Sequence, residues 1–263
     1  MLDSGTEASP AVKAFGVSET GPVRRINEDC FVSDEELRLF VVADGMGGHA
    51  AGEVAAKVAV ESIENFIRRS HETSDFSWPY GIDGSLSYEA NRLKTAVCLA
   101  NRRINRLAES HDDYLGMGST VVCALLSGGQ LIVAHVGDSR LYLFTGTELV
   151  QLTEDDSWAA TLLGNKIGGN GGMGGMGTRH VLTNVLGARP DTQVHVLDRE
   201  ISGSETLLLC SDGLHGSVPH ERLHEIIASK QDPSALAQLL VSAALEHDSR
   251  DNITALVVSC SGQ

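Results

Sequence analysis

Apolar and polar positions follow two different periods along the chain, and the changes of period mark the expected elements. Short apolar or alternating runs bounded by turn residues predict strands at 12–18, 37–43, 119–126, 130–136, 140–144, 193–196, 206–210 and 253–259. Apolar residues spaced three and four apart predict helices over about 52–69, 88–109, 219–229 and 233–247. The pair Gly128-Gly129 lies between two of the strands and predicts a tight hairpin.

The order of these elements favours an α+β fold. Strands come first, two long helices follow, and a long series of strands leads to short helices and a last strand. This order lacks the regular strand–helix alternation of Rossmann and TIM-barrel proteins. It predicts a β-sandwich flanked by helices, built as one domain over residues 12–261 after a disordered tail at 1–11. Residues 164–177 include eight glycines in fourteen positions, so this segment is expected to be mobile.

The composition narrows the classes of partner. With 35 acidic and 20 basic residues the formal net charge is −15, which argues against nucleic acid as the main partner. An acidic surface suits a protein that holds cations, although solubility is the commoner reason for one. Five well-separated cysteines without a CxxC pair indicate reduced thiols in a cytoplasmic protein. No apolar run approaches the roughly 18 residues that span a bilayer, so no membrane segment is expected.

Short acidic motifs interrupt or follow the apolar runs. Asp44, Asp138 and Asp212 each follow a strand-like segment, and two further motifs are Asn27-Glu28-Asp29 and Asp251-Asn252. Any one Asp-Gly pair has an ordinary explanation as a turn at the end of a strand. Five such motifs together favour a site made of oxygen ligands, which suits Mg²⁺, Mn²⁺ or Ca²⁺ better than Zn²⁺ or Cu²⁺.

These motifs, in this order, resemble the type 2C metal-dependent protein phosphatases (the PPM family), in particular the bacterial-type members. The matching stretches are TGPVRRINEDCF, FVVADGMGGHAAGEVAA, GMGSTVV, LIVAHVGDSRLYL, QLTEDDS, HVLTNVLGA, LLLCSDGLHGSV and DNITALVV. They extend from about residue 15 to 259. The resemblance implies a four-layer αββα sandwich of two mostly antiparallel sheets flanked by helix pairs, with a Gly-rich flap at about 155–187. It also implies hydrolysis of phosphoserine and phosphothreonine by two Mn²⁺ or Mg²⁺ ions that activate water, without a covalent intermediate.

The resemblance also assigns roles to individual residues. It implies that Asp44 bridges the two catalytic metals beside the Gly45 carbonyl, and that Asp212 and Asp251 are further direct ligands. Glu28 resembles a ligand that acts through metal-bound water, and Asp138 resembles a ligand of a third, weaker metal shared with Asp212. Arg24 matches the arginine that grips the substrate phosphate, with Arg25 as the less favoured choice. The expected partners are phosphorylated proteins made by a Ser/Thr kinase, and a monomer is the family expectation.

Two departures from the family pattern leave questions open. Eukaryotic-type members have a histidine, proposed as general acid, where this chain has Met46. His49, a metal-bound water and the Asp138 region remain alternatives for that role. Asp248 stands where members usually carry glycine. The flap is hypothesised to select substrates and to close slowly.

Two other functions have some support in the sequence. Residues 220–224 read HERLH, which matches the HExxH signature of zinc proteases, and Glu246 could be a third ligand. Pro219, however, puts this motif in the first turn of a short helix, where a solvated surface face is the better explanation. A pseudophosphatase that binds phosphoproteins without turnover is disfavoured because Asp44, Asp212 and Asp251 are all present.

Overall fold

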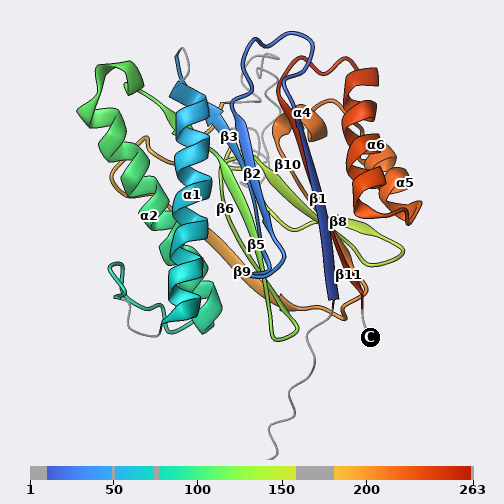
Figure 1. Cartoon of the computed structure of the whole chain (residues 1–263), viewed down its shortest axis with the longest axis horizontal. Coiled ribbons are helices and arrows are strands. Elements are labelled where there is room, and N and C mark those ends of the chain that lie inside the picture. Colours follow the sequence, from blue (N-terminus) through green and yellow to red (C-terminus); the bar gives the residue numbers. More distant parts are fainter. Residues whose placement is uncertain (1–10, 49–50, 74–76, 158–180, 262–263) are drawn as a thin grey trace, which may run out of the picture.

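The computed structural model describes residues 11–48, 51–73, 77–157 and 181–261 of the chain. Two antiparallel sheets pack face to face, and helices cover the outer side of each (Figure 1). The tail predicted at 1–11 lies outside the described residues except for Ala11, which begins the first strand. None of the helices in the described part of the chain is long and apolar enough to cross a bilayer.

Each strand belongs to one of the two sheets, and several strands that pair within a sheet are not consecutive in the sequence. The first sheet has the order β1 (Ala11–Glu19), β11 (Ile253–Ser261), β10 (Thr206–Cys210), β7 (Arg140–Phe144) and β8 (Leu149–Gln151). The second has the order β2 (Asp29–Asp34), β3 (Leu39–Met46), β5 (Val121–Ser127), β6 (Gln130–Val136) and β9 (His195–Glu200), with β4 (Gly118–Ser119) paired to the end of β3. Every named pairing is antiparallel.

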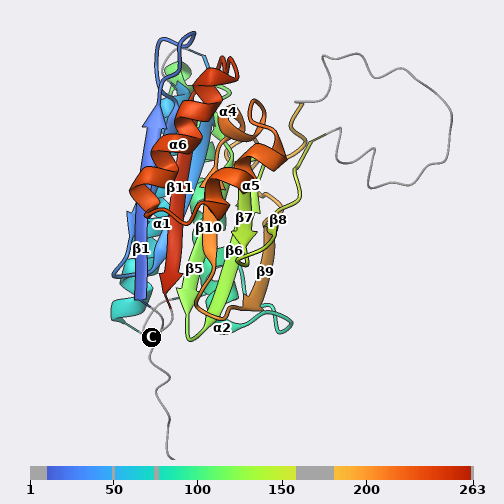
Figure 2. The same cartoon turned by 90° about the vertical axis from the view of Figure 1, so that its right-hand side faces the viewer.

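Helices form the two outer layers. The second sheet is covered by α1 (Ala51–Glu72) and α2 (Tyr88–Ser110), which is followed by the 3-10 turn η1 (Asp112–Tyr114). On the opposite side, α5 (His220–Ala228) and α6 (Pro233–Glu246) cover the first sheet, as Figure 2 shows. A single-turn helix, α4 (Asp212–His215), connects β10 to this outer layer.

Three apolar layers hold the four layers of structure together. Along β3, Leu39, Val41 and Ala43 pack against α1 and α2, whereas Phe40 and Val42 face the other sheet. Both faces of this strand are therefore buried, which is why its sequence is continuously apolar instead of alternating. A third layer lies between the first sheet and α5 and α6. The predicted αββα sandwich is confirmed.

The sequence predicted the long elements better than the short ones. The four predicted helices agree with α1, α2, α5 and α6 within about three residues at each end. Neither β2, β8 nor α4 was predicted, because β2 has acidic residues at both ends and the other two are very short. The strand predicted at 193–196 is shifted to β9, a sheet-edge strand whose second half is charged and exposed.

Two turns depend on unusual backbone angles. Gly128 and Gly129 have φ values of +56° and +77°, so the predicted hairpin between β5 and β6 is confirmed as a two-residue turn with both central residues left-handed. Asp248, which replaces the family's usual glycine, has φ +58°. Aspartate is among the few non-glycine residues that tolerate this region, so the loop before β11 keeps a left-handed turn without glycine.

The predicted flap is only partly described. Its glycine run lies outside the described residues, so the hypothesis that it selects substrates remains a prediction. The two ends of the segment are described, and they are bound to each other and to the second sheet. Ser157 bridges to Leu182, and Ser119, at the end of β4, bridges to Leu186.

Candidate active site

One cavity of about 230 Å³ collects the residues that the sequence singled out. It lies where the ends of several strands meet. β3 and β6 are both antiparallel to β5 and therefore end at the same edge of their sheet, and the end of β10 lies beside the start of β11. The predicted residues that line the cavity are Arg24, Glu28, Asp44, Gly45, Asp138, Asp212 and Asp251. The structure thus brings together every predicted site residue.

The backbone of Asp44 is held firmly from β4 and the residue after it. Its amide donates to Thr120 Oγ1 at 3.1 Å, while its carbonyl accepts from the Thr120 amide at 2.8 Å and from Ser119 Oγ at 3.0 Å. Asp44 was expected after the strand, but it lies inside β3, paired with Asp29 of β2. Its carboxylate is therefore carried by paired strand and not by a loose turn.

Gly45 lies where three segments of chain touch. Its amide donates to the Glu28 carbonyl at 3.1 Å. A Cβ atom on Gly45 would lie 1.9 Å from the Gly52 carbonyl oxygen, and one on Gly52 would lie 2.3 Å from Glu28 Oε1. The glycines at these positions serve close approach, because neither has a positive φ. They bring the start of α1 against the Glu28 side chain.

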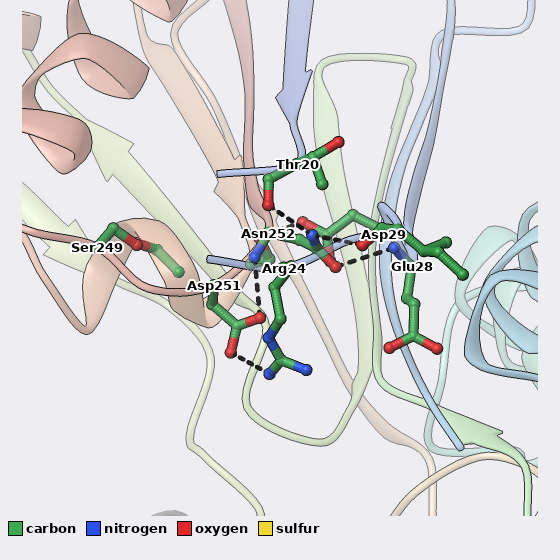
Figure 3. A network of polar contacts seen from close by, with 10 residues as sticks. Thr20, Arg24, Glu28, Asp29, Ser249, Asp251 and Asn252 are labelled. Atoms are coloured by element: carbon green, nitrogen blue, oxygen red, sulfur yellow. Dashed lines mark hydrogen bonds and ion pairs between the residues drawn. The ribbon is translucent and has the colours of Figure 1, made fainter. Parts of the chain in front are cut away.

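Asn252 fastens the loop that carries Arg24 and Glu28 to the start of β11. Its side-chain amide donates to the carbonyls of Thr20 and Ile26 at 2.9 and 3.0 Å, and its Oδ1 accepts from the Glu28 amide at 2.9 Å (Figure 3). All three hydrogen bonds join residues more than 220 positions apart in the sequence. This side chain therefore sets the position of Glu28 relative to Asp251.

Asp29 lies beneath the cavity and is buried. Its Oδ2 accepts from Thr254 Oγ1 at 2.6 Å and from Ser211 Oγ at 2.7 Å. Burial raises the pKa of Asp29 to about 7 against these hydrogen bonds, and the nearby charges of Asp212 and Asp251 add to the rise. Asp29 thus links the start of β2 to Ser211, which follows β10, and to Thr254 of β11.

Arg24 is the cation that lines the cavity. Its Nη2 donates to Asp251 Oδ2 at 2.7 Å, and both side chains are more than a third exposed. The hydrogen bond to Asp251 is the main cause that raises the pKa of the guanidinium above its usual value. Arg25, the less favoured alternative, is exposed and is not part of the cavity lining.

The carboxylates of the cavity destabilise one another's charged forms. Burial, followed by the charges of Asp29, Asp212, Asp138 and Asp251, raises the pKa of Asp44 well above its ordinary value. Burial and the charge of Asp212 raise the pKa of Asp138 to about 7. Glu28 Oε1 is buried without a hydrogen-bond partner in the described part of the chain, and burial raises the pKa of Glu28. Arg24 offsets only part of this negative charge, and hard divalent cations would supply the rest.

The geometry suits ions that keep much of their water. Within the described residues, no three His, Cys, Asp or Glu side chains form a closed ligand set for one ion. Mg²⁺ is commonly held by only one or two carboxylates together with water and substrate phosphate, so an open arrangement of carboxylates fits it. Structural and catalytic zinc sites need three or four protein ligands, and they fit poorly here.

The raised pKa values predict a stability change with pH. Asp29 and Asp138 titrate near 7 in the fold and near 3.8 when unfolded, so the folded state holds protons that the unfolded state releases. With EDTA, raising the pH from 6 to 8 is expected to lower the Tm by about 4 °C, since each such group loses about 1 kcal/mol. Excess Mn²⁺ should remove this fall, as scanning calorimetry would measure.

A variant that lacks one of the two titrating carboxylates is the control for this pH experiment. Asp138→Asn should reduce the slope in EDTA because it removes one of the two titrating groups. His135, whose pKa burial lowers to about 4, acts in the opposite direction and offsets part of the fall in Tm, because its unfolded-state imidazole loses its remaining charge between pH 6 and 8. An equal slope with EDTA and with Mn²⁺ would contradict the assignment of Asp138 to the cation site.

The turn that carries Asp138 is tied to the base of the flap segment. Gly137, with φ +94°, donates its amide to Asp156 Oδ2 at 3.0 Å, and the Asp156 amide returns a bond to the Gly137 carbonyl at 3.0 Å. The other oxygen of Asp156 lies 2.9 Å from His195 Nε2 on β9. Asp156 therefore holds the Asp138 turn, the flap base and β9 together.

Comparison with known proteins places this site in a family. The sequence profile of the protein phosphatase 2C family matches residues 25–246. The chain belongs to the protein phosphatase 2C family. The predicted resemblance is confirmed, and the matched region covers well over half of the chain.

Individual family members can be aligned with this chain along nearly their whole length. The serine/threonine phosphatase Stp of Listeria monocytogenes is 35% identical over 245 residues, which are 92% of this chain and 93% of that protein. The crystal structure of the Mycobacterium tuberculosis serine/threonine phosphatase PstP has a TM-score of 0.80 at 30% identity, covering 95% of this chain and 99% of that one. A structure of the PstP catalytic domain in complex with two manganese ions has a TM-score of 0.79 at 30% identity, with the same coverage.

As a protein phosphatase 2C member, the chain is a serine/threonine phosphatase with phosphoproteins as its substrates and Mn²⁺ or Mg²⁺ as its cofactor. Arg24 and Asp251 both lie just outside the matched profile region, and the structure nevertheless places them in the cavity. The HExxH rival fails: His220 and His224 lie on α5, and His224 Nε2 bonds the Thr147 carbonyl at 2.9 Å.

Some residues around the site had no assigned role in the sequence-based prediction. Thr120 lines the cavity and holds the Asp44 backbone, and its Oγ1 also lies 2.6 Å from Ser139 Oγ. Asn252 and Thr254 were equally unassigned. The only available signal was their position inside the matching stretches GMGSTVV and DNITALVV, which does not reveal partners so distant in sequence.

Proposed function

We propose that this chain hydrolyses phosphoserine and phosphothreonine by direct attack of water, without a covalent phosphoenzyme. The observation that carries the proposal is the convergence of Glu28, Asp44, Asp138, Asp212 and Asp251 on one cavity beside a single arginine. Two divalent ions bound by such carboxylates would lower the pKa of a coordinated water and neutralise charge on the phosphoryl group. The protein itself then has to position the ions and the substrate.

The carboxylates are proposed to divide the work of holding the ions. Asp44, the Gly45 carbonyl, Asp212 and Asp251 would hold the two ions directly. Glu28 acts through coordinated water, which its buried and unpartnered Oε1 supports. Asp138, with Asp212, is proposed to hold a third and weaker ion. Burial and the nearby charge of Asp212 raise the pKa of Asp138, which supports this.

Arg24 is proposed to orient the substrate phosphate. A guanidinium presents paired N–H donors that match two phosphate oxygens, so it fixes the phosphoryl group for attack from one side. The ion pair with Asp251 holds the guanidinium at the cavity. A bound ion would compensate the charge of Asp251, and the guanidinium of Arg24 would then be free to bind the phosphate.

The decisive experiment measures turnover of p-nitrophenyl phosphate and of a phosphothreonine peptide with EDTA, Mg²⁺, Mn²⁺ or Zn²⁺. Turnover is expected with Mn²⁺ or Mg²⁺ but not with EDTA or Zn²⁺. Titration calorimetry should find at least two Mn²⁺ bound per chain. Tight Mn²⁺ binding without turnover would favour a phosphoprotein-binding role. Turnover in EDTA would contradict the two-metal mechanism.

Arg24→Ala is expected to raise the KM for the phosphothreonine peptide about 10- to 100-fold, since a charged pair to phosphate contributes about 1.5–3 kcal/mol. Arg24→Lys should recover little of this loss, because an ammonium cannot form the two parallel bonds. Steady-state kinetics measure both. Arg25→Ala is the matched control and should change the KM less than about threefold. A larger effect from Arg25→Ala would reverse the assignment.

We also propose that the phosphatase opposes a Ser/Thr kinase as a monomer in the cytoplasm. All five cysteines are free, and three of them are buried, which supports a reducing compartment. Burial raises the pKa of the Cys210 thiol to about 12 and that of Cys260 to about 11, so these thiols are inert. Size-exclusion chromatography with light scattering tests the monomer.

A further inference from the structure

A groove of about 700 Å³ lies on the outer side of α1 and α2, away from the catalytic cavity. The two helices run side by side over the second sheet (Figure 1). Four arginines line the groove, one from α1 and three from α2: Arg69, Arg102, Arg103 and Arg106. All four are exposed. The groove is therefore a concentrated basic surface on a protein whose net charge is −15.

The fold does not use these arginines as ion-pair partners. Other arginines of the same two helices are paired: Arg68 with Asp34 and Glu64, and Arg92 with Glu89. The four groove arginines form no ion pair with any residue in the described part of the chain. Residues 95–108 of α2 contain no acidic side chain at all. Glu72 and Glu109 follow Arg69 and Arg106 by three residues, but they form no ion pair with these arginines in the described part of the chain. The four positive charges of the groove exceed these two carboxylates, so an anionic partner would be favoured.

The bottom of the groove is apolar. Phe66 of α1 and Leu99 and Leu107 of α2 line it and are half-buried. Phe66 and Arg69 are three residues apart on α1, and Leu99, Arg103 and Leu107 follow one another at four-residue spacing on α2. Apolar side chains between basic ones match a segment that has apolar residues on one side and carboxylates on both flanks.

We propose that this groove is a docking site for an acidic, partly apolar segment of the phosphoprotein substrate, bound at the same time as the phosphoresidue in the catalytic cavity. The proposal rests on the phosphatase function proposed above. A polyanion such as nucleic acid fits less well, because beyond about 8 Å from the groove it would meet the negative surface of the rest of the protein. A short acidic segment contacts the basic groove without extending onto the negative surface around it.

The distance along α1 between the catalytic cavity and the groove determines how far the acidic segment of the substrate must lie from the phosphorylated residue. Gly52, at the start of α1, lies against the Glu28 side chain of the catalytic cavity. Ser62 and Arg69, which line the groove, follow 10 and 17 residues later, so the groove begins roughly 15–25 Å along the helix at 1.5 Å per residue. An extended chain needs at least about 5–8 residues to cover this distance. The acidic segment should therefore lie at least that far from the phosphorylated residue.

The test compares two phosphothreonine peptides that differ only in a segment of alternating Glu and Leu placed ten residues from the phosphothreonine. In the second peptide every Glu of that segment is Gln. The wild-type KM should be at least about fivefold lower for the Glu peptide. Arg102→Glu/Arg106→Glu should lose this preference, and salt at about 0.5 M should weaken it in the wild type. Hydrolysis of p-nitrophenyl phosphate should be unchanged.

The matched control is Arg199→Glu/Arg222→Glu, which makes the same change of charge at exposed positions on β9 and α5. It should keep the preference for the Glu peptide. Equal loss in both double variants would overturn the proposal in favour of overall charge, and no preference in the wild type would overturn it directly. Stronger competition by a single-stranded oligonucleotide or by anionic lipid vesicles than by the unphosphorylated Glu peptide would overturn the choice of partner.

A binding measurement separates this proposal from the catalytic one. Fluorescence anisotropy with a labelled, unphosphorylated Glu peptide reports docking without turnover. Binding that is lost at least about tenfold in Arg102→Glu/Arg106→Glu and kept in the control supports the groove even if the two-metal mechanism fails. If p-nitrophenyl phosphate is hydrolysed in a metal-dependent way but the peptide does not bind, the docking proposal is wrong and the catalytic proposal stands.

Discussion

Replacing Asp44 with asparagine is expected to lower kcat at least about 1000-fold, which corresponds to about 4 kcal/mol of transition-state stabilisation. Burial and then the charges of Asp29, Asp212, Asp138 and Asp251 raise the pKa of Asp44, so the Asp44 carboxylate lies among these acidic groups. Its backbone is fixed by Thr120 and Ser119, and the amide of asparagine would keep the shape of the side chain. The loss is therefore one of charge at the ions, as Mn²⁺-dependent hydrolysis of p-nitrophenyl phosphate would measure.

The same variant should change stability in the opposite direction when metal is absent. A carboxylate whose pKa is raised in the fold destabilises the folded state at neutral pH, so Asp44→Asn should stabilise the EDTA-treated protein. The expected gain is about 1–2 kcal/mol, the scale of a buried polar group without a partner. Mn²⁺ should raise the Tm of the wild type and barely change that of the variant, so the order of stability reverses.

Asp198→Asn is the control for this experiment. Asp198 lies exposed on β9, away from the cavity lining, and its substitution should leave activity, Tm and the Mn²⁺ response nearly unchanged. Retention of more than about a tenth of the activity by Asp44→Asn would show that its carboxylate is not a shared ligand. An equal Mn²⁺ shift of Tm in variant and wild type would lead to the same conclusion.

The sequence predicted the members of the site because each acidic residue has a local signal. Asp44, Asp138 and Asp212 all come at or near the ends of strands so apolar that a carboxylate there needs compensation. The resemblance to the phosphatase family added Arg24 and the role of Glu28, and both residues lie in a loop without any periodic pattern. The structure shows that these residues share one cavity, while their individual roles as ligands remain predictions.

The contacts that hold the site together could not be predicted in this way. Asp29 is bonded by Ser211 and Thr254, which lie 182 and 225 residues away, and hydroxyl groups in strands carry no signal for such partners. Asn252 likewise fixes Glu28 only through the packing of β11 beside the first loop. These hydrogen bonds depend on strand order in the two sheets, and the order of antiparallel strands does not follow from the apolar pattern of each strand alone.

The glycines of the site also have a meaning that only the fold reveals. Gly45 was expected to permit a sharp turn after Asp44, yet it lies in β3 without a positive φ. Its function is close approach, since a Cβ there would lie 1.9 Å from the Gly52 carbonyl oxygen and 2.8 Å from the Glu28 carbonyl oxygen. Both contacts are with backbone atoms, which cannot swing aside as the end of a side chain can.

Gly45→Ala is therefore expected to lower the Tm by about 6–10 °C and kcat at least about 100-fold. Overpacking of this kind costs about 3 kcal/mol, and its relief must push α1 away from β3. That movement separates Gly52 from Glu28 and shifts Glu28 relative to Asp44. Differential scanning fluorimetry and p-nitrophenyl phosphate kinetics with saturating Mn²⁺ measure the two effects.

Gly48→Ala, three residues along the same DGMGG sequence, is the matched control. A Cβ at Gly48 would have no heavy atom of the described residues within 4 Å, and Gly48 has no positive φ. This variant should stay within about 1 °C of the wild-type Tm and within about twofold of its activity. If both alanine variants lose activity to the same degree, the loop needs glycine for its own flexibility. If only Gly45→Ala fails, the close contact between β3 and α1 is what keeps the metal-binding carboxylates in place, because the two substitutions add the same methyl group three residues apart.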